Sequence, residues 1–174
     1  MGLCGAPDDV YLALRGLRTL EVRLARHMAS GLKVAGWLND RPEVLSVLHP
    51  GLPQDRGHTL WKRDMTGSTG LFSIVLDGWS KEDAARFIDA LTLFGIGYSW
   101  GGYESLAVPG DFTRTATAWH DSGPLIRLHI GLEDPDDLIA DLDAAFAAGP
   151  RMPATSSRRR RMGATRPAVS WPRS

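Results

Sequence analysis

The stretch LIRLHIGLEDPDDLIADLDAAFA, residues 125–147, decides the fold, because its apolar residues change from the spacing of a strand to that of a helix. Ile126, Leu128 and Ile130 alternate with other side chains, which predicts a strand with these three residues on one face. Pro135 suits the first turn of a helix, and the acids beside it lie near the positive end of the helix dipole. The stretch therefore predicts a strand followed by a helix.

Further strand and helix patterns lie on the N-terminal side of this stretch. Short apolar runs predict strands over 44–48, 70–76, 95–99 and 125–130, and helical spacing predicts helices over 80–91 and 135–147. Strands followed by helices that cover one face give an α+β layer. We therefore expect an α/β fold, with a mainly antiparallel four-stranded sheet covered on one face by helices.

One long amphipathic helix is predicted before the first strand. Its apolar positions recur at spacings of three and four residues or multiples of them: Val10, Leu14, Leu17, Leu24, Met28, Ala35 and Leu38. Asp8 or Asp9 is a suitable N-cap, and Pro42 is a suitable stop. A helix of roughly 30 residues is far longer than the ~11-residue average. We expect residues 1–40 to connect a domain over 41–148 to another layer or domain.

Charge is unevenly distributed, although basic and acidic side chains each number 20. Residues 151–174 carry seven arginines and no acid, so the rest of the chain has a net charge of −7. We expect 149–174 to be a disordered arginine-rich tail, because it has few apolar residues to offset the entropy of ordering. An arginine run can bind phosphate backbones, but Trp171 is its one aromatic residue and no nucleic-acid-binding motif accompanies it. Nucleic-acid binding is therefore not favoured.

Length and composition favour one soluble domain in a reducing cytosol. The 174 residues are 43% hydrophobic and 23% charged, enough to bury a core. Cys4 is the only cysteine, and no charged-then-apolar leader is present. No apolar run approaches the ~20 residues of a membrane-spanning helix. The five histidines lack metal-ligand spacing, so no metal site is predicted.

Arg127 is the first candidate functional residue. It lies within an apolar strand, on the face opposite Ile126 and Leu128. A buried arginine needs an anionic partner, because an unpaired buried charge costs several kcal/mol. One interpretation is an internal salt bridge to an acid of this chain. The other is a carboxylate of a ligand, whose geometry matches the guanidinium fork.

The second candidate is the turn Ser99-Trp100-Gly101-Gly102, which follows a predicted strand. Paired glycines let the backbone approach a ligand and expose its amides. Ser99 could donate a hydroxyl, and Trp100 a backbone amide, to the same carboxylate as Arg127. The alternative is an ordinary strand-end turn, in which Tyr98, Trp100 and Tyr103 are aromatic residues of the core or its rim.

Five ordered segments together resemble one known family. They are YLALRGLRTL (11–20), VLSVLHPGLP (44–53), LWKRD (60–64), GIGYSWGGYESL (95–106) and LIRLHIGLED (125–134). Through them, residues 5–148 resemble the C-terminal part of the pyridoxal-phosphate enzymes of cysteine and methionine metabolism. The resemblance implies the fold of the small C-terminal domain of fold type I enzymes.

Within that family, GYSWGG followed by RLHIGLED looks like the cystathionine β-lyases. This resemblance implies cleavage of cystathionine to homocysteine, pyruvate and ammonia in methionine biosynthesis, with pyridoxal phosphate as cofactor. It also implies that Arg127 pairs with the substrate α-carboxylate, that Ser99 and the Trp100 backbone help to hold it, and that Tyr98 lines the pocket. The interpretation of Arg127 and the turn as a carboxylate clamp agrees with these roles.

The chain departs from the family in its lysines. The family's Schiff-base lysine and its cofactor contacts belong to an N-terminal portion without counterpart here, and Lys33, Lys62 and Lys81 are the only lysines. That lysine holds the cofactor and moves a proton. We therefore expect a C-terminal fragment that is inactive, and binds no cofactor, on its own. The alternative is a noncatalytic module that self-associates or docks on a separately encoded cofactor-binding half through the apolar face of its first helix.

Overall fold

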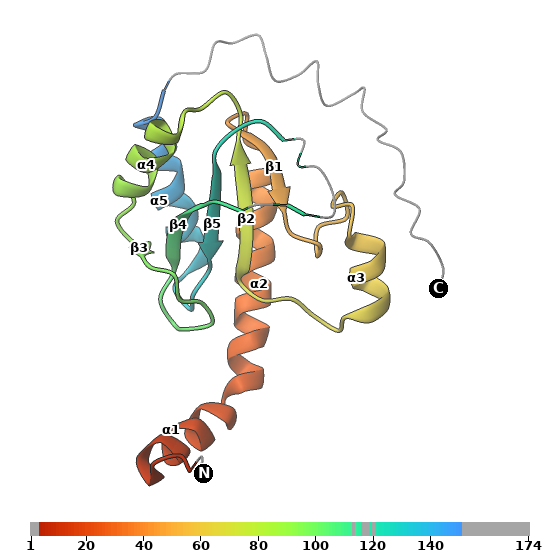
Figure 1. Ribbon diagram of the computed structural model, residues 1–174, viewed down its shortest axis with the longest axis vertical. Coiled ribbons are helices and arrows are strands. Elements are labelled where there is room, and N and C mark those ends of the chain that lie inside the picture. The colour runs from red at the N-terminus through yellow and green to blue at the C-terminus, as the bar shows by residue number, and fades with distance from the viewer. Residues whose placement is uncertain (1–3, 113, 116–118, 120, 151–174) are drawn as a thin grey trace.

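A five-stranded mixed sheet forms the centre of the protein (Figure 1). The computed structural model describes residues 4–112, 114, 115, 119 and 121–150. The strands are β1 (Val44–Leu48), β2 (Leu71–Leu76), β3 (Gly95–Ile96), β4 (Leu106–Gly110) and β5 (Leu125–His129), in the order β1-β2-β5-β4-β3. All neighbouring strands are antiparallel except β3 and β4, which pair in parallel. The predicted β5 is thus the central strand.

Helices α2 (Leu20–Asn39) and α5 (Pro135–Ala147) cover one face of this sheet. The other helices of the described residues are α1 (Pro7–Leu17), α3 (His58–Asp64) and α4 (Lys81–Asp89). In Figure 1, α2 and α5 lie behind the strands, and they also pack against each other. Ile126, Leu128 and Ile130 are fully buried on that side, together with Leu38 of α2 and Leu142 of α5. The expected α/β class with a mainly antiparallel sheet covered by helices is confirmed.

The number of strands differs from the expectation of four. Residues 106–110 form β4, which sequence patterning does not reveal because Pro109 lacks a backbone N–H and is rare inside strands. Pro109 is tolerated opposite Ile126 of β5. The strand expected over 95–99 is only Gly95–Ile96, because the chain then enters a turn in which Gly101 has a φ of +79°.

The expected N-terminal helix is divided in two. Thr19 has φ −112° and ψ 9°, which interrupts the helix between α1 and α2. The carbonyl oxygen of Gly16 accepts hydrogen bonds from the Thr19 hydroxyl (3.3 Å) and the Arg23 guanidinium (2.7 Å). These side chains stabilise the break, and glycine has low helix propensity. No residue of α1 is buried, so no packing holds it in line with α2.

A short helix and the C-terminal tail are the remaining parts of the chain that bear on the sequence-based expectations. The short helix α3 within 58–64 was not expected, and it covers the LWKRD segment. The expected disordered tail lies, beyond Pro150, outside the described residues. No helix among the described residues combines the length and apolarity that crossing a membrane requires.

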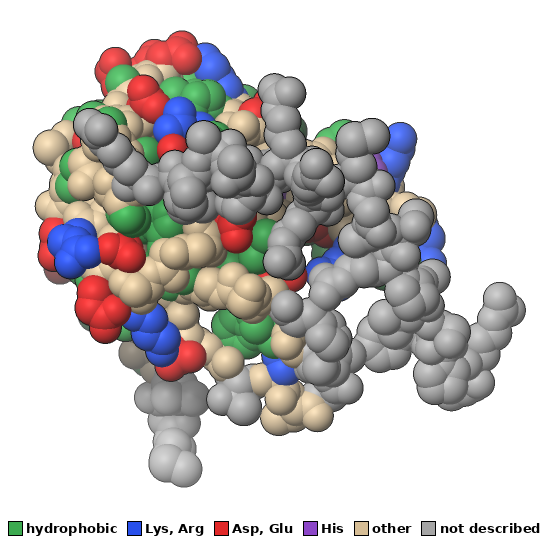
Figure 2. All heavy atoms as spheres, turned by 90° about the horizontal axis from the view of Figure 1, so that it is seen from above, with side chains coloured by type: hydrophobic (Ala, Val, Ile, Leu, Met, Phe, Trp, Pro, Cys, Tyr) green, Lys and Arg blue, Asp and Glu red, His purple; other side chains and the backbone are tan. Residues whose placement is uncertain are grey.

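The surface at the end opposite α1 carries side chains of both charges. Seen from that end, acidic and basic groups lie close together with apolar atoms between them (Figure 2). Ion pairs among the described residues include that of Arg41 with Asp143 at 2.7 Å. The visible part of this face that the structure describes therefore shows no extended patch of one charge.

The carboxylate of Asp141 on α5 fixes the segment that leads into β3. It is 8% exposed and accepts hydrogen bonds from the backbone N–H groups of Thr92 (2.9 Å) and Leu93 (2.9 Å), and from the Thr92 hydroxyl (2.6 Å). A buried backbone N–H without a partner is unfavourable. Asp141 therefore anchors the chain just before the turn that follows β3.

We expect Asp141→Ala to lower the free energy of unfolding by roughly 3 kcal/mol, because two backbone donors lose their acceptor. Asp143→Ala, on the same helix, removes an exposed ion pair and should cost about 1 kcal/mol or less. Urea denaturation followed by circular dichroism measures both. Equal losses for the two variants would contradict the anchoring role of Asp141.

Candidate functional site

Arg127 lies at the centre of the open sheet face, the face opposite the helices. On β5 it is in register with Ser73 of β2 and Val108 of β4. Its neighbours along the strand, Ile126 and Leu128, are fully buried in the core, so alternation directs Arg127 to the other side. The sequence therefore fixes the face on which this side chain lies.

The guanidinium of Arg127 contacts the turn after β3. Its Nη2 donates long hydrogen bonds, both 3.4 Å, to the carbonyl oxygens of Gly97 and Ser99. Its Cζ lies 5.7 Å from the centre of the Tyr98 ring, in cation–π range. Within the described residues no carboxylate oxygen lies within 4 Å of the guanidinium. The internal salt bridge is therefore not formed there.

The turn presents its side chains to solvent. Tyr98 is 79% exposed and Trp100 is 61% exposed, and Ser99 is exposed between them. Tyr103 is also exposed, so these aromatic residues do not belong to the core. The structure thus brings Tyr98 and Ser99 to Arg127. Trp100 lies in the same turn but makes no hydrogen bond or cation–π contact with Arg127 in the described chain.

His129, two residues after Arg127 on the same strand face, holds the second half of the turn. The Gly101 N–H points to its ring, 3.1 Å from Nε2 and 3.4 Å from Nδ1, and the Gly102 oxygen lies 3.2 Å from Nε2. The ring is 2% exposed. Burial lowers the pKa of His129 below its usual range, and the neighbouring His27 adds to this effect. A neutral ring is therefore favoured.

Ser105 and Glu133 attach the end of the same loop to the segment after β5. The Glu133 carboxylate accepts from the Ser105 N–H and hydroxyl, each at 2.8 Å. The Ser105 oxygen accepts from the Gly131 N–H at 2.8 Å. A Cβ on Gly131 would lie 2.2 Å from the Tyr103 carbonyl oxygen, so this close approach requires glycine. The loop over 97–105 is thus held at both ends.

His129, Ser105 and Glu133 were not predicted as site residues. Strand alternation did place His129 on the same face as Arg127, and that was the available signal. The pairing of Ser105 with Glu133 spans 28 residues and leaves no local pattern.

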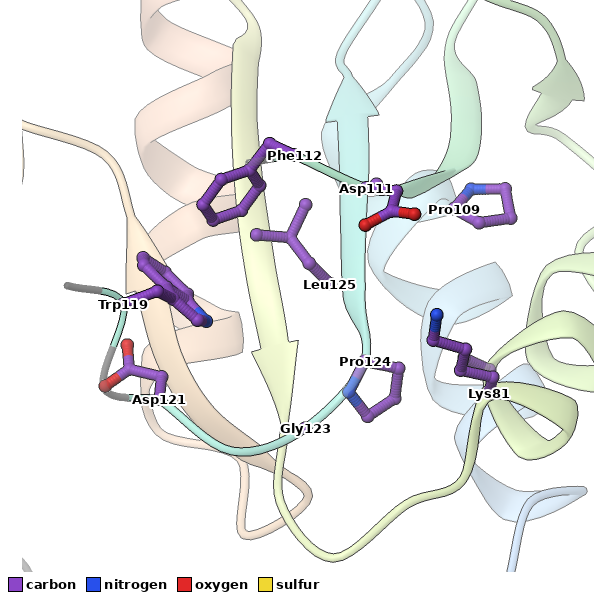
Figure 3. Close-up of a pocket in the computed structure, with 11 residues that line it drawn as sticks. Lys81, Pro109, Asp111, Phe112, Trp119, Asp121, Gly123, Pro124 and Leu125 are labelled. Atoms are coloured by element: carbon purple, nitrogen blue, oxygen red, sulfur yellow. The ribbon is translucent and has the colours of Figure 1, made fainter. Parts of the chain in front are cut away.

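A separate pocket of about 380 Å³ lies at the other end of β5 (Figure 3). Phe112, Trp119, Pro124 and Leu125 form its apolar walls, and Lys81 lies at its edge. The Phe112 and Trp119 rings pack edge to face with centres 4.8 Å apart. None of the four predicted site residues lines this pocket. Among the described residues, no group of three or more potential metal ligands was found.

Comparison with solved structures gives the class of protein. The O-acetylhomoserine (thiol)-lyase metY of Campylobacter jejuni, solved with N'-pyridoxyl-lysine-5'-monophosphate, matches 82% of this chain and 33% of its own chain with a TM-score of 0.71 and 36% identity. The fold is therefore that of part of a pyridoxal-phosphate-dependent enzyme.

Sequence comparison gives the family. The family model described as Cys/Met metabolism PLP-dependent enzyme matches residues 1–147, and the chain belongs to this family. It is 53% identical over 153 residues to cystathionine beta-lyase MetC of Escherichia coli, covering 84% of this chain and 39% of MetC. It is 45% identical over 146 residues to the L-alanine/L-glutamate racemase of Wolbachia pipientis, covering 82% of this chain and 36% of the racemase. The chain thus spans less than half the length of these relatives.

Pyridoxal phosphate is the cofactor of this family. The described residues do not fit it by themselves, because no lysine lies at the Arg127 site. Lys33 is exposed and binds Asp136 at 2.7 Å, while Lys62 and Lys81 are exposed on α3 and at the start of α4. The described residues therefore place the Arg127 guanidinium beside the turn, without an amine that could hold the cofactor.

We expect the protein to lose stability below about pH 6.5, the usual pKa of histidine. Burial lowers the pKa of both His49 and His129 in the folded state. The unfolded chain then binds more protons, so stability is complete above that pH and falls as pH drops toward the folded pKa values. The loss is at most about 1.4 kcal/mol per pH unit for each histidine.

Urea denaturation at pH 7.5 and 5.5 measures this effect. The double variant His49→Gln with His129→Gln should show a smaller difference between the two pH values. His58→Gln, which removes a partly exposed imidazole, serves as the control. A wild-type protein equally stable at both pH values would contradict the expectation.

Proposed function

We propose that this chain provides the substrate-carboxylate-binding part of a cystathionine β-lyase-like active site. The observation that carries the proposal is Arg127, which has no carboxylate partner in the described chain and lies beside the Ser99 turn. In this proposal residues 41–148 are the binding domain and residues 1–40 connect it to a cofactor-binding part. A cytosolic location belongs to the proposal, supported by the free, exposed Cys4.

The carboxylate clamp, which we define as Arg127, the Ser99 hydroxyl and the Trp100 backbone, suits an amino-acid substrate. Guanidinium binds a carboxylate through two parallel hydrogen bonds that are stronger than neutral ones. The present hydrogen bonds of Arg127 to backbone carbonyls are long, at 3.4 Å, so a ligand carboxylate competes with them favourably. Tyr98 would then line one side of the bound substrate.

Relatives support a substrate that carries an α-carboxylate. MetC is named as a cystathionine β-lyase, and the Wolbachia relative is named as a racemase of alanine and glutamate. All of these substrates are amino acids, so the α-carboxylate is the group that they share. We propose cystathionine, with homocysteine, pyruvate and ammonia as products, because identity to MetC is the higher of the two.

In this proposal, a separate cofactor-binding part supplies the catalytic lysine and the cofactor contacts. The three lysines of this chain are exposed and none contacts Arg127. Without that lysine, the family's chemistry has no group to hold the cofactor and move the substrate proton. We therefore propose that the chain alone has no lyase activity.

An assay of pyruvate release tests the proposal. The purified chain with pyridoxal phosphate and cystathionine should release none, and adding a separately expressed cofactor domain of a relative should restore activity. Arg127→Ala should then lower kcat/KM by roughly 100-fold or more, because a charge-assisted contact to substrate is lost. Arg86→Ala, on the exposed side of α4, should leave it unchanged.

Two outcomes would reject the clamp. One is turnover by the chain alone. The other is full activity of Arg127→Ala in the restored enzyme. Failure to restore activity with any cofactor domain would reject a working half-site.

A second candidate function is docking on a separately encoded cofactor-binding half. The observation that favours it is the N-terminal arm, which we define as residues 7–24. Figure 1 shows the arm extending away from the sheet. Its exposed apolar residues are Val10, Tyr11, Leu12, Leu14, Leu17, Leu20, Val22 and Leu24. An apolar surface of this extent marks an interaction site.

We expect the arm to bind the cofactor domain of a relative. Val22 is 74% exposed, so Val22→Glu should weaken the complex without unfolding the chain. Leu60→Glu, on exposed α3, is the matched control. Sedimentation velocity measures the complex. A compact monomer without affinity for the cofactor domain would contradict docking, and a homodimer sensitive to Val22→Glu would replace it with self-association.

A further inference from the structure

The turn that carries the proposed clamp is held by two alternate residues of one strand. Arg127 binds the carbonyl oxygens of Gly97 and Ser99 in the first half of the turn. His129 contacts Gly101 and Gly102 in the second half, at 3.1 and 3.2 Å from its Nε2. The two side chains therefore divide the turn between them. The carboxylate ligand is expected at Arg127. His129 therefore supports the turn without contacting the ligand.

The contacts of His129 require one donor and one acceptor on the ring. The Gly101 N–H needs an acceptor, and the Gly102 oxygen needs a donor. A neutral imidazole has one of each, whereas a protonated imidazole has two donors and cannot accept from Gly101. With Nε2–H directed to Gly102, Nδ1 faces the Gly101 N–H at 3.4 Å. Protonation would therefore break the attachment at Gly101.

We infer that His129 is a positioning residue of the carboxylate clamp, whose neutral imidazole holds Gly101 and Gly102 and thereby keeps Ser99 beside Arg127. This inference rests on the proposed function for the ligand, but the attachment of the turn can be measured without it. The role differs from that of Arg127, because His129 acts on the ligand only through the backbone of the turn. His129 therefore determines where the turn backbone and Ser99 lie relative to Arg127.

The charged groups around His129 agree with a neutral ring. Its surface is almost fully buried, and burial is the main cause of its lowered pKa. His27 of α2 has its ring centre 5.2 Å away, and Arg127 lies on the same strand; both disfavour a positive charge on His129. Glu133 favours it, as does the contact with Gly102, but their effect is smaller in sum.

His27 is itself fixed by the core. Its Nδ1 lies 2.8 Å from the carbonyl oxygen of Ile130, so this nitrogen carries the hydrogen and donates. Its Nε2 is buried and has no hydrogen-bond partner in the described chain. His27 therefore packs against His129 without competing for Gly101 or Gly102.

Amide hydrogen exchange of Gly101 in the full chain tests the attachment. His129→Ala should accelerate it about tenfold or more, since a hydrogen bond worth about 1.4 kcal/mol corresponds to a factor of ten. His129→Gln should retain slow exchange, because one amide group can both accept from Gly101 and donate to Gly102. His49→Gln, which alters another buried histidine outside the turn, should also retain it.

Binding of L-cystathionine, followed by NMR at the Ser99 and Trp100 amides, tests the link to the clamp. His129→Ala should weaken it about fivefold or more, since loss of a positioning hydrogen bond is worth about 1 kcal/mol. His129→Gln should restore it. On acidification of the wild type, the Gly101 amide signal and the affinity should change with the titration of the His129 ring, and His129→Gln should abolish this step.

Several results would overturn the inference. One is a rate of Gly101 amide exchange that is unchanged in His129→Ala. Another is a change of the Gly101 signal and of the affinity on acidification of His129→Gln that equals that of the wild type. The third is a loss of binding in His49→Gln equal to that in His129→Ala. If His129→Ala does not fold, the wild-type titration and His129→Gln decide. If the wild type binds no cystathionine while the Gly101 amide signal still changes with the titration of the His129 ring, the proposed function fails and the attachment of the turn stands.

Discussion

The two-sided character of β5 is the constraint on which the rest of the structure depends. One side of this central strand must be apolar, because Ile126 and Leu128 lie in the same buried core as apolar residues of α2 and α5. The pleat then places Arg127 and His129 on the other side, at the middle of the sheet. The five residues of β5 therefore supply both the core and the candidate site. A shift of the strand by one residue would turn its apolar side chains to the open face and Arg127 and His129 to the core.

Local signals were sufficient for the elements that local interactions form. Helical spacing predicted α4, which begins with a capping box of Ser80 and Asp83 in the structure, and the proline at its first turn marked the start of α5. β4 was missed because its stability comes from pairing with β5, which outweighs the poor strand propensity of Pro109. The break at Thr19 depends on side chains that replace the helix hydrogen bond at Gly16.

The candidate site was predictable to a similar degree. Alternation placed Arg127 on the correct face, and the glycines indicated a turn after the third predicted strand. The support of that turn was beyond sequence reasoning, because His129, Ser105 and Glu133 act across gaps of 26 to 28 residues. Two features of this chain also have no partner within the described residues: the guanidinium of Arg127 lacks a carboxylate, and the N-terminal arm lacks a covering surface.

The order in which the protein folds follows from the long sequence separation between the 97–105 loop and its partners near β5. Every bond between the 97–105 loop and the β5 region closes a loop of more than 25 residues, so the backbone entropy of that segment is lost only once β4 and β5 are paired. The sheet thus has to exist before the turn can attach to it. Because opening the turn breaks only a few hydrogen bonds, we expect the recognition surface to open and close as a unit while the sheet remains intact.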